Sequence, residues 1–139
     1  MALLSGDREI RELLTASHTI AVVGLSDKPS RTSYHVSRYM QEQGYSIIPV
    51  NPGIAEALGV PAVPDLESIP EPIDIVNIFR RPEFVPDIVE AAIAIKAKAV
   101  WMQLGIAHDA AARRASDAGL QVVMDQCIMV EHSRLMFRA

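Results

Sequence analysis

Short apolar runs alternate along the chain with longer stretches in which apolar residues recur at helical spacing. The apolar runs are rich in β-branched residues and end at Gly, Pro or Asn, which is typical of parallel strands buried on both faces. They predict strands at 19–24, 45–52, 73–79, 97–102 and 120–124. Between the second and third of these, residues 54–64 predict one helical turn and a short strand near 60–63.

The amphipathic stretches predict helices at 7–16, 32–43, 82–95 and 107–118, and a helical turn or two within 130–136. Asp7 suits the cap of the first helix, and Gly44 and Gly119 are stop signals after the second and fourth. The start of the third helix is open, because Pro86 cannot donate to a preceding turn. The faces expected to point inward are Ile10, Leu13 and Leu14; Val36, Tyr39 and Met40; and Phe84, Ile88, Ala91, Ala92 and Ile95.

Strands and helices that alternate in this way form parallel β-α-β units with right-handed crossovers. We therefore expect an α/β fold: a single Rossmann-like, doubly wound, mainly parallel sheet with helices on both faces, in one domain spanning 1–139. With the strand order 3-2-1-4-5-6, the topological switch point lies between the strands 19–24 and 73–79. Ligands bind such folds at the carboxyl ends of the strands. The segments expected there are 24–34, 51–52, 79–81, 103–105 and Asp125.

Composition narrows the class of protein. Half of the 139 residues are hydrophobic, yet no apolar run approaches the roughly 20 residues of a membrane-spanning helix. The first residues do not read as a signal peptide, and a single cysteine suits a reducing cytosol. The net charge of −4 argues against nucleic-acid binding. We expect a cytoplasmic protein that holds any anionic ligand with a local cluster of donors.

The turn after the first strand is the most informative segment. A dinucleotide fingerprint G-x-G-x-x-G would fall on Gly24, Ser26 and Pro29, so only its first glycine is present. Gly24 still permits a tight turn and a close backbone approach. Lys28 and Arg31 add positive charge next to the start of a helix, where backbone amides bind anions. The hydroxyl of Ser26 can donate to a phosphate, as can those of Ser30, Thr32 and Ser33. This composition favours phosphate binding; the alternative is a polar loop with a helix cap.

A second clue is the residue type after the second strand. NAD sites usually place a carboxylate there to bind the ribose hydroxyls, whereas this chain has Asn51 followed by Pro52. A neutral site tolerates a phosphorylated ribose. Across the switch point, Arg80 directly follows a strand and suits a diphosphate or a ribose phosphate, as does Arg81. The alternative, two solvated arginines before a helix, fits Arg81 better than Arg80.

Several segments together carry a family resemblance: AVVGLSDKPSRTSYHVSRYM, GYSIIPVNP, PAVPDLESIPEPIDIVNIFRRPEFVP, AVWMQLGI and GLQVVMDQCIMVEHSRL. The chain resembles the small, stand-alone CoA-binding domain proteins, whose fold is similar to the CoA-binding domain of succinyl-CoA synthetase α subunits. The resemblance implies that CoA is the ligand, in a nucleotide pocket lined by Gly24, Ser26, Lys28, Pro29, Arg31 and Ser33. It implies further that Asn51 and Pro52 lie near the adenosine, Phe79 and Arg80 beside the diphosphate, and Gln103 and Gly105 beside the pantetheine path.

The residues form no catalytic constellation. The family commonly has an arginine between the aspartate and the cysteine near the C-terminus, where this chain has Gln126. No positive charge adjoins Cys127 to lower its thiol pKa, so a small buried residue is favoured over a reactive thiol. By resemblance, synthetase chemistry runs through a phosphorylated histidine in a second domain, which is not part of this sequence. The four histidines, which lack metal-ligand spacing, are His18, His35, His108 and His132.

Three hypotheses follow. The first is a binding module for CoA or an acyl-CoA: a carrier, sensor or regulatory module. The second is an NAD(P)-binding enzyme or redox sensor, in which Arg31 and the neutral Asn51 would select NADP. The third is a subunit of an acyl-CoA synthetase that gains activity on a partner chain. A homodimer is also open, and the methionines 124, 129 and 136 offer apolar surface for contacts, although core packing explains them more simply.

Overall fold

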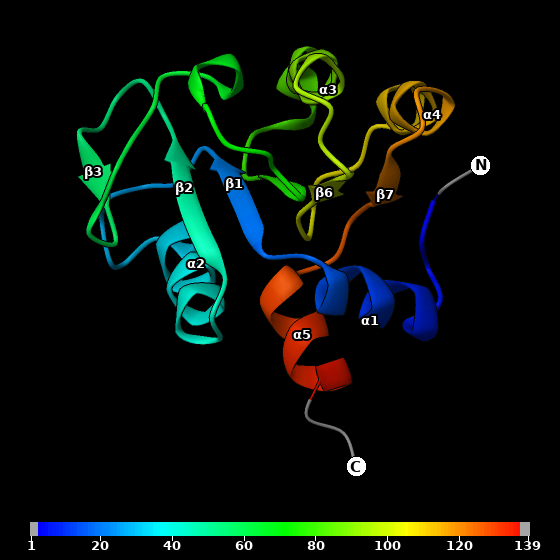
Figure 1. The fold of residues 1–139 in the computed structure, drawn as a ribbon, viewed down its shortest axis with the longest axis horizontal. Coiled ribbons are helices and arrows are strands. Elements are labelled where there is room, and N and C mark those ends of the chain that lie inside the picture. Colours follow the sequence, from blue (N-terminus) through cyan, green and yellow to red (C-terminus); the bar gives the residue numbers. More distant parts are fainter. Residues whose placement is uncertain (1–2, 137–139) are drawn as a thin grey trace.

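The computed structural model describes residues 3–136 and contains a five-stranded parallel sheet (Figure 1). The expected domain also includes residues 1–2 and 137–139, which lie outside this range. In sheet order the strands are β2 (Ser46–Val50), β1 (Thr19–Val23), β5 (Ile75–Ile78), β6 (Ala99–Met102) and β7 (Gln121–Val123). This arrangement confirms the doubly wound, Rossmann-like α/β fold.

Helices cover both faces of the sheet (Figure 1). One face carries α1 (Asp7–Ala16), α2 (Thr32–Glu42) and α5 (Ile128–Met136). The other carries α3 (Val85–Ala94) and α4 (Asp109–Asp117). Because successive strand residues point to opposite faces, β5 sends Ile75 toward the first group and Val76 toward the second. Two apolar cores result, one on each side of the sheet.

The topological switch point lies where the sequence predicts it, because β1 pairs with β2 on one side and with β5 on the other. The expected third strand is nearly absent. Val63 alone takes its place in the sheet, where it forms a parallel bridge to Val50. Its N–H donates to the carbonyl of Pro49 at 3.0 Å, and its carbonyl accepts from the N–H of Asn51 at 2.9 Å.

The helical turn expected within 54–64 is wrong. The segment instead forms a small antiparallel ribbon of β3 (Glu56–Ala57) and β4 (Val60–Pro61). Leu58 and Gly59 join the strands with φ angles of 56° and 76°. Two consecutive residues with positive φ make the tight hairpin turn that matches strand twist, and this turn excludes a right-handed helix.

Apart from shifts of one or two residues at the ends of α2 and α4, three helices begin differently from the prediction. Gly6, not Asp7, caps α1, and no side chain bonds to the cap. The third predicted helix begins as a 3₁₀ turn, η2 (Pro82–Phe84), and becomes α-helical at Val85, whose successor Pro86 is tolerated in the first turn. The last helix is longer than expected, since α5 begins at Ile128.

The buried face of α3 is also offset from the predicted one. Val85, Val89 and Ala92 form it, whereas Ile88 and Ala91 are only partly buried. These last two line a pocket at the edge of the sheet, which explains their partial exposure. Within the described residues, no helix is both long and apolar enough to cross a membrane.

Candidate functional site

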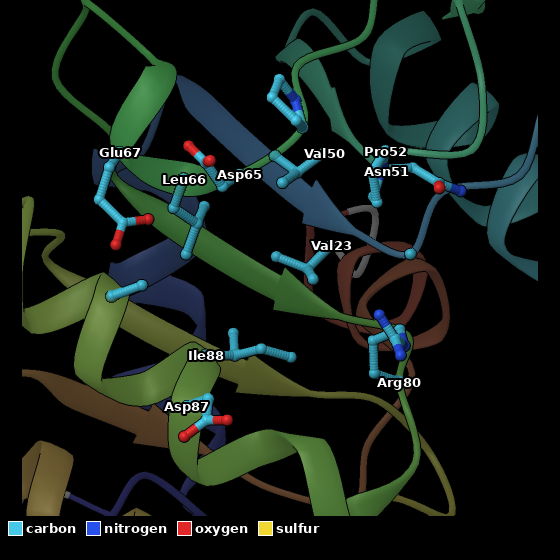
Figure 2. Close-up of a pocket in the computed structure, with 13 residues that line it drawn as sticks. Val23, Val50, Asn51, Pro52, Asp65, Leu66, Glu67, Arg80, Asp87 and Ile88 are labelled. Atoms are coloured by element: carbon cyan, nitrogen blue, oxygen red, sulfur yellow. The ribbon is translucent and has the colours of Figure 1, made fainter.

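Two pockets meet at the carboxyl edge of the sheet, on either side of Gly24. The strand-end pocket, on the side of α3, has a volume of about 460 Å³ (Figure 2). Its lining residues are Val23, Gly24, Val50, Asn51, Pro52, Pro64, Asp65, Leu66, Glu67, Arg80, Asp87, Ile88 and Ala91. The turn pocket, on the side of α2, has a volume of about 430 Å³ and is lined by Gly24, Ser26, Arg31, Thr32, Ser33 and Phe79. Both volumes are within the range of small-molecule sites.

Gly24 is required by the approach of β1 to β5. Its φ is +89°, and a Cβ built on it would lie 2.5 Å from the carbonyl oxygen of Phe79. The N–H of Phe79 donates to the carbonyl of Val23 and continues the pairing of β1 with β5. The N–H of Gly24 donates to the carbonyl of Val50 and continues the pairing of β1 with β2. The expected close approach therefore occurs between two segments of the chain itself. Gly24 lines both pockets, so the two pockets adjoin at this residue.

The hydroxyl groups of the turn are held by its backbone. The N–H of Ser26 donates to Oγ of Ser33 at 3.0 Å, and the N–H of Lys28 donates to Oγ of Ser26 at 3.1 Å. Since each hydroxyl oxygen already accepts a hydrogen bond, each O–H remains a donor. Both serines line the turn pocket, with Ser33 buried and Ser26 half-buried, and their contact with a phosphate stays a prediction.

The N-terminus of α2 opens into the turn pocket. Its N-cap residue, Arg31, has extended backbone and gives no side-chain cap, and its first turn holds no acidic residue. The N–H groups of the first turn and the positive end of the helix dipole favour an anion there. Within residues 3–136, neither Lys28 nor Arg31 forms an ion pair with a carboxylate. Among the described residues, the turn therefore presents two cationic side chains without an ion-pair partner.

Asn51 ties the ends of β1 and β2 together. Its Nδ2 donates to the carbonyl of Leu25 at 3.0 Å, and its Oδ1 accepts from the N–H of Gly53 at 2.8 Å. Both ends of the amide are engaged, so Asn51 shapes the strand-end pocket. Pro52 follows it in the pocket wall.

Arg80 and Arg81 have different neighbours, although both guanidinium groups lie over the Phe84 ring. The guanidinium of half-buried Arg80 lies 4.3 Å from the centre of the Phe84 ring and forms no ion pair within the described chain. Arg81 is exposed and pairs with Glu83 at 3.5 Å. A stacked guanidinium is held in place without losing its charge. The support of Arg80 by Phe84 was not predicted, although the two residues are four apart in sequence.

The strand-end pocket has carboxylates that the sequence argument did not foresee. The position after β2 is neutral, but Asp65, Glu67 and Asp87 line the wall away from Arg80 (Figure 2). They come from η1 (Leu66–Ser68), its cap and α3, which are remote from β2 in sequence. Oδ1 of Asp65 caps η1 by accepting from the N–H and Oγ of Ser68 at 2.9 and 2.6 Å. The pocket beside the neutral Asn51 therefore also has acidic residues in its lining, and the place of a ribose in it stays a prediction.

Four of the residues expected at the site line neither pocket: Lys28, Pro29, Gln103 and Gly105. Gln103 is buried and its Nε2 donates to Oδ1 of Asn77 at 2.9 Å. The N–H of Gly105 donates to Oδ1 of Asp125 at 2.6 Å. Their contact with a ligand stays a prediction.

The remaining chemistry-bearing residues lie apart from the pockets. His132 is buried with Nδ1 at 3.0 Å from the Tyr39 hydroxyl, and burial lowers its pKa from the ordinary 6.5. Nδ1 of His108 accepts from the N–H of Ala111 and caps α4. Cys127 is half-buried, not fully buried as expected. Across residues 3–136, His, Cys, Asp and Glu form no group of three that could hold a metal ion.

Comparisons with known proteins agree with this fold. The family model described as a CoA binding domain matches residues 18–133. The chain therefore belongs to the CoA-binding domain family. It is 51% identical over 125 residues to YneT of Bacillus subtilis (strain 168), described as an uncharacterized protein, with 90% of this chain and 93% of that protein covered.

Two solved structures share the whole architecture. A hypothetical protein from Pyrococcus horikoshii OT3 is 41% identical, with a TM-score of 0.92 over 95% of this chain and 93% of that one. A protein of Thermus thermophilus, cell-free ID.343, is 41% identical, with a TM-score of 0.90 over 94% and 99%. A dinucleotide-forming acetyl-coenzyme A synthetase from Ca. Korarchaeum cryptofilum shares the fold alone, at 22% identity. The match has a TM-score of 0.73 and covers 84% of this chain and 27% of the synthetase.

Proposed function

We propose that this protein binds CoA or an acyl-CoA and serves as a non-catalytic carrier, sensor or regulatory module. One observation carries the proposal: two pockets of nucleotide size meet at Gly24, one with an apolar floor and the other at an uncapped helix N-terminus with unneutralised cations. Membership of the CoA-binding domain family supports the same ligand.

In the proposed complex, the diphosphate lies at the N-terminus of α2. The first-turn amides, the hydroxyls of Ser26 and Ser33 and the side chain of Arg31 donate to its oxygens. The adenosine occupies the strand-end pocket, where Val23, Val50 and Ile88 provide apolar surface for the base. Arg80 lines that pocket near its junction with the turn pocket and neutralises further phosphate charge.

The rest of the predicted site follows the same ligand. Lys28 and Pro29 belong to the loop above the diphosphate. Gln103 and Gly105 follow β6, the next strand along the edge, and lie on the proposed path of the pantetheine arm. These assignments make the carboxyl edge of the sheet one continuous site, crossed by a single extended ligand.

Thermal unfolding with CoA, acetyl-CoA, NAD, NADP and ATP at equal concentration tests the proposal. A ligand at about 100 times its Kd adds roughly 2.7 kcal/mol to the free energy of unfolding. For a chain of 139 residues this raises Tm by on the order of 5–10 °C. We expect the shift with CoA and acetyl-CoA. A shift with NADP or NAD alone would replace CoA with a nicotinamide nucleotide.

A charge variant tests the turn pocket directly. Arg31→Ala removes one charged donor at the helix N-terminus, so we expect CoA affinity to fall by about 1–2 kcal/mol, roughly five- to thirty-fold. Arg38→Ala, an exposed arginine farther along α2, is the matched control and should leave the affinity unchanged. Equal losses in both variants would mean a diffuse charge effect in place of a phosphate contact. Isothermal titration calorimetry measures both.

A synthetase subunit is a second candidate, supported by the fold match to one segment of a longer acetyl-coenzyme A synthetase chain. In that case an ATP-grasp-type partner would supply the chemistry. A stable complex with such a protein in a pull-down, with synthetase activity only in the mixture, would favour this function over the stand-alone module.

A further inference from the structure

Arg80 lies at the junction of the strand-end pocket and the turn pocket. Among the described residues that line the strand-end pocket it is the only cation, and the carboxylates lie away from it (Figure 2). Its side chain packs beside Gly24, because a Cβ built on this glycine would lie 3.0 Å from Cδ of Arg80. Since Gly24 lines both pockets, a ligand that extends from one pocket into the other passes Arg80.

The guanidinium of Arg80 is held in place with its charge available. It lies 4.3 Å from the centre of the Phe84 ring, and within residues 3–136 it forms no ion pair. The N–H donors of a guanidinium lie in its plane, so a ring against its face leaves them at the edges. The side chain is half-buried, so solvent screens its charge less than that of an exposed arginine. This arrangement suits a bidentate contact with a phosphate.

The proposed position of the diphosphate decides which part of CoA reaches Arg80. With the diphosphate at the N-terminus of α2, the attached ribose enters the strand-end pocket beside Gly24, and the base continues over the apolar floor. Asn51 lies at the same end, because its Nδ2 donates at 3.0 Å to the carbonyl of Leu25, the residue after Gly24. The ribose therefore meets a cation and a neutral amide at this end.

The two pockets divide the phosphates of CoA between them. The turn pocket has its own donors for the diphosphate, namely the first-turn amides of α2, two serine hydroxyls and Arg31, and Arg80 is not in its lining. A phosphate on the ribose brings about −1.5 to −2 charges into the strand-end pocket. There, Arg80 is the only cation of the described lining that can offset them.

We infer that Arg80 binds the 3′-phosphate of CoA and makes the protein selective for CoA over dephospho-CoA, which lacks that phosphate. The inference rests on the proposed function, because it takes the diphosphate to lie in the turn pocket and the adenosine in the strand-end pocket. The carboxylates of Asp65, Glu67 and Asp87 act in the same direction. They repel a phosphate from their wall and so confine it to the Arg80 end.

The experiment measures Kd for CoA and for dephospho-CoA by isothermal titration calorimetry. The readout is the ratio Kd(dephospho-CoA)/Kd(CoA), which cancels any general loss of affinity. Arg80→Met removes the charge and the donors but keeps an unbranched side chain, and Arg80→Lys keeps the charge without the planar fork. The control is Arg81→Met, the same change at a guanidinium that also lies over the Phe84 ring but lines neither pocket.

We expect wild type to bind CoA about tenfold or more tighter than dephospho-CoA, as one charge-assisted contact implies. In Arg80→Met the ratio should fall to within about twofold of one, through a loss of CoA affinity alone. Arg80→Lys should give an intermediate ratio, and Arg81→Met should keep the wild-type ratio. Higher ionic strength should lower the ratio in wild type and leave it unchanged in Arg80→Met.

Two results would overturn the inference and leave the proposed function standing, because CoA would still bind. The first is a wild-type ratio of one. The second is a ratio that Arg80→Met leaves unchanged, with equal losses for both ligands, or that Arg81→Met lowers as much as Arg80→Met does. Binding of neither ligand by wild type would overturn both the inference and the proposed function.

Discussion

At the scale of single residues, neighbouring atoms decide what a residue type means. Gly24 and Gly44 both have positive φ, +89° and +102°. Gly44 has open space where a Cβ would be, so it serves only to end α2, whereas Gly24 lies against the backbone of Phe79. The sequence identifies both as glycines at turns, but only the packing of β1 against β5 separates their roles.

Replacing Gly24 by alanine should therefore cost more than replacing Gly44. Gly44→Ala places a side chain at positive φ and should lower the free energy of unfolding by about 1–2 kcal/mol. Gly24→Ala adds a clash with the Phe79 carbonyl, and we expect a loss of about 2–4 kcal/mol. Urea unfolding measures both. Equal losses of unfolding free energy in the two variants would show that β5 shifts away from the added methyl group at no measurable energetic cost.

The arginine pair permits a second comparison of neighbours. Both guanidinium groups lie over the Phe84 ring, at 4.3 Å for Arg80 and 5.4 Å for Arg81, but only Arg80 lines the strand-end pocket, while Arg81 pairs with Glu83. We expect Arg80→Ala to weaken CoA binding by about 1–2 kcal/mol and Arg81→Ala to change it by less than about 0.5 kcal/mol, measured by calorimetry. A larger loss of CoA affinity in Arg81→Ala than in Arg80→Ala would contradict a phosphate contact of Arg80 in the strand-end pocket.

At the scale of elements, α5 closes the helical face opposite the strand-end pocket. Its His132 packs edge-on against Tyr39 of α2 and Tyr45, with ring centres 5.5 and 5.7 Å away. Burial lowers the pKa of His132 below 6.5, so the folded chain favours the neutral ring. The junction of α1, α2 and α5 is thus sensitive to acid.

This shift predicts a pH-dependent stability with a definite sign. Protonation of His132 favours the unfolded chain, because the pKa is lower in the folded state. The stabilisation of the folded chain by neutral His132 is therefore fully present above pH 6.5. It declines as the pH falls from 6.5 toward the folded-state pKa. The slope cannot exceed about 1.4 kcal/mol per pH unit for one proton. Urea unfolding at pH 7.5, 6.5 and 5.5 should show a steeper decline in wild type than in His132→Gln.

The control is His35→Gln, which changes an exposed histidine of α2 and should keep the wild-type slope. Asp74 does not interfere in this range. Burial raises its pKa, but hydrogen bonds from the backbone of Thr19 and His18 and from Lys98 outweigh burial and hold the pKa below 3.8. Its contribution is therefore lost only at lower pH. Equal slopes in wild type and His132→Gln would contradict the assignment.

At the scale of the whole molecule, one sheet joins both cores and both pockets. Trp101 of β6 is fully buried in one core, and its neighbour Met102 is fully buried in the other. Each pocket draws its wall from strand ends of this sheet together with a helix of one face. Loss of the sheet would remove both cores together.

We therefore propose that the chain unfolds as one domain. Urea transitions followed by far-UV circular dichroism, which reports the helices, and by Trp101 fluorescence, which reports the core of β6, should have coincident midpoints. Separate midpoints would show that the two faces of the sheet unfold independently.

The sequence by itself determined the five strands of the sheet, the main helices and the switch point, but not the hairpin of β3 and β4. Each depends on local patterns, namely β-branched runs, helical periodicity and glycine stops, that differ little between an isolated segment and the folded chain. A strand followed by a polar turn and a helix is also a local signal. It predicted a turn that contains Gly24, Ser26, Arg31 and Ser33, and these residues line the turn pocket.

Only the tertiary structure decided the composition of the strand-end pocket. Glu67 and Asp87 lie on segments remote from Asn51, and no local pattern brings their carboxylates to the same cavity. The contact of Arg80 with Phe84 likewise depends on how η2 packs. The lack of room for a side chain at Gly24 depends on how β5 packs. Charge acts through space, so the sign of the field in a pocket is set by the folded arrangement and not by neighbours in sequence.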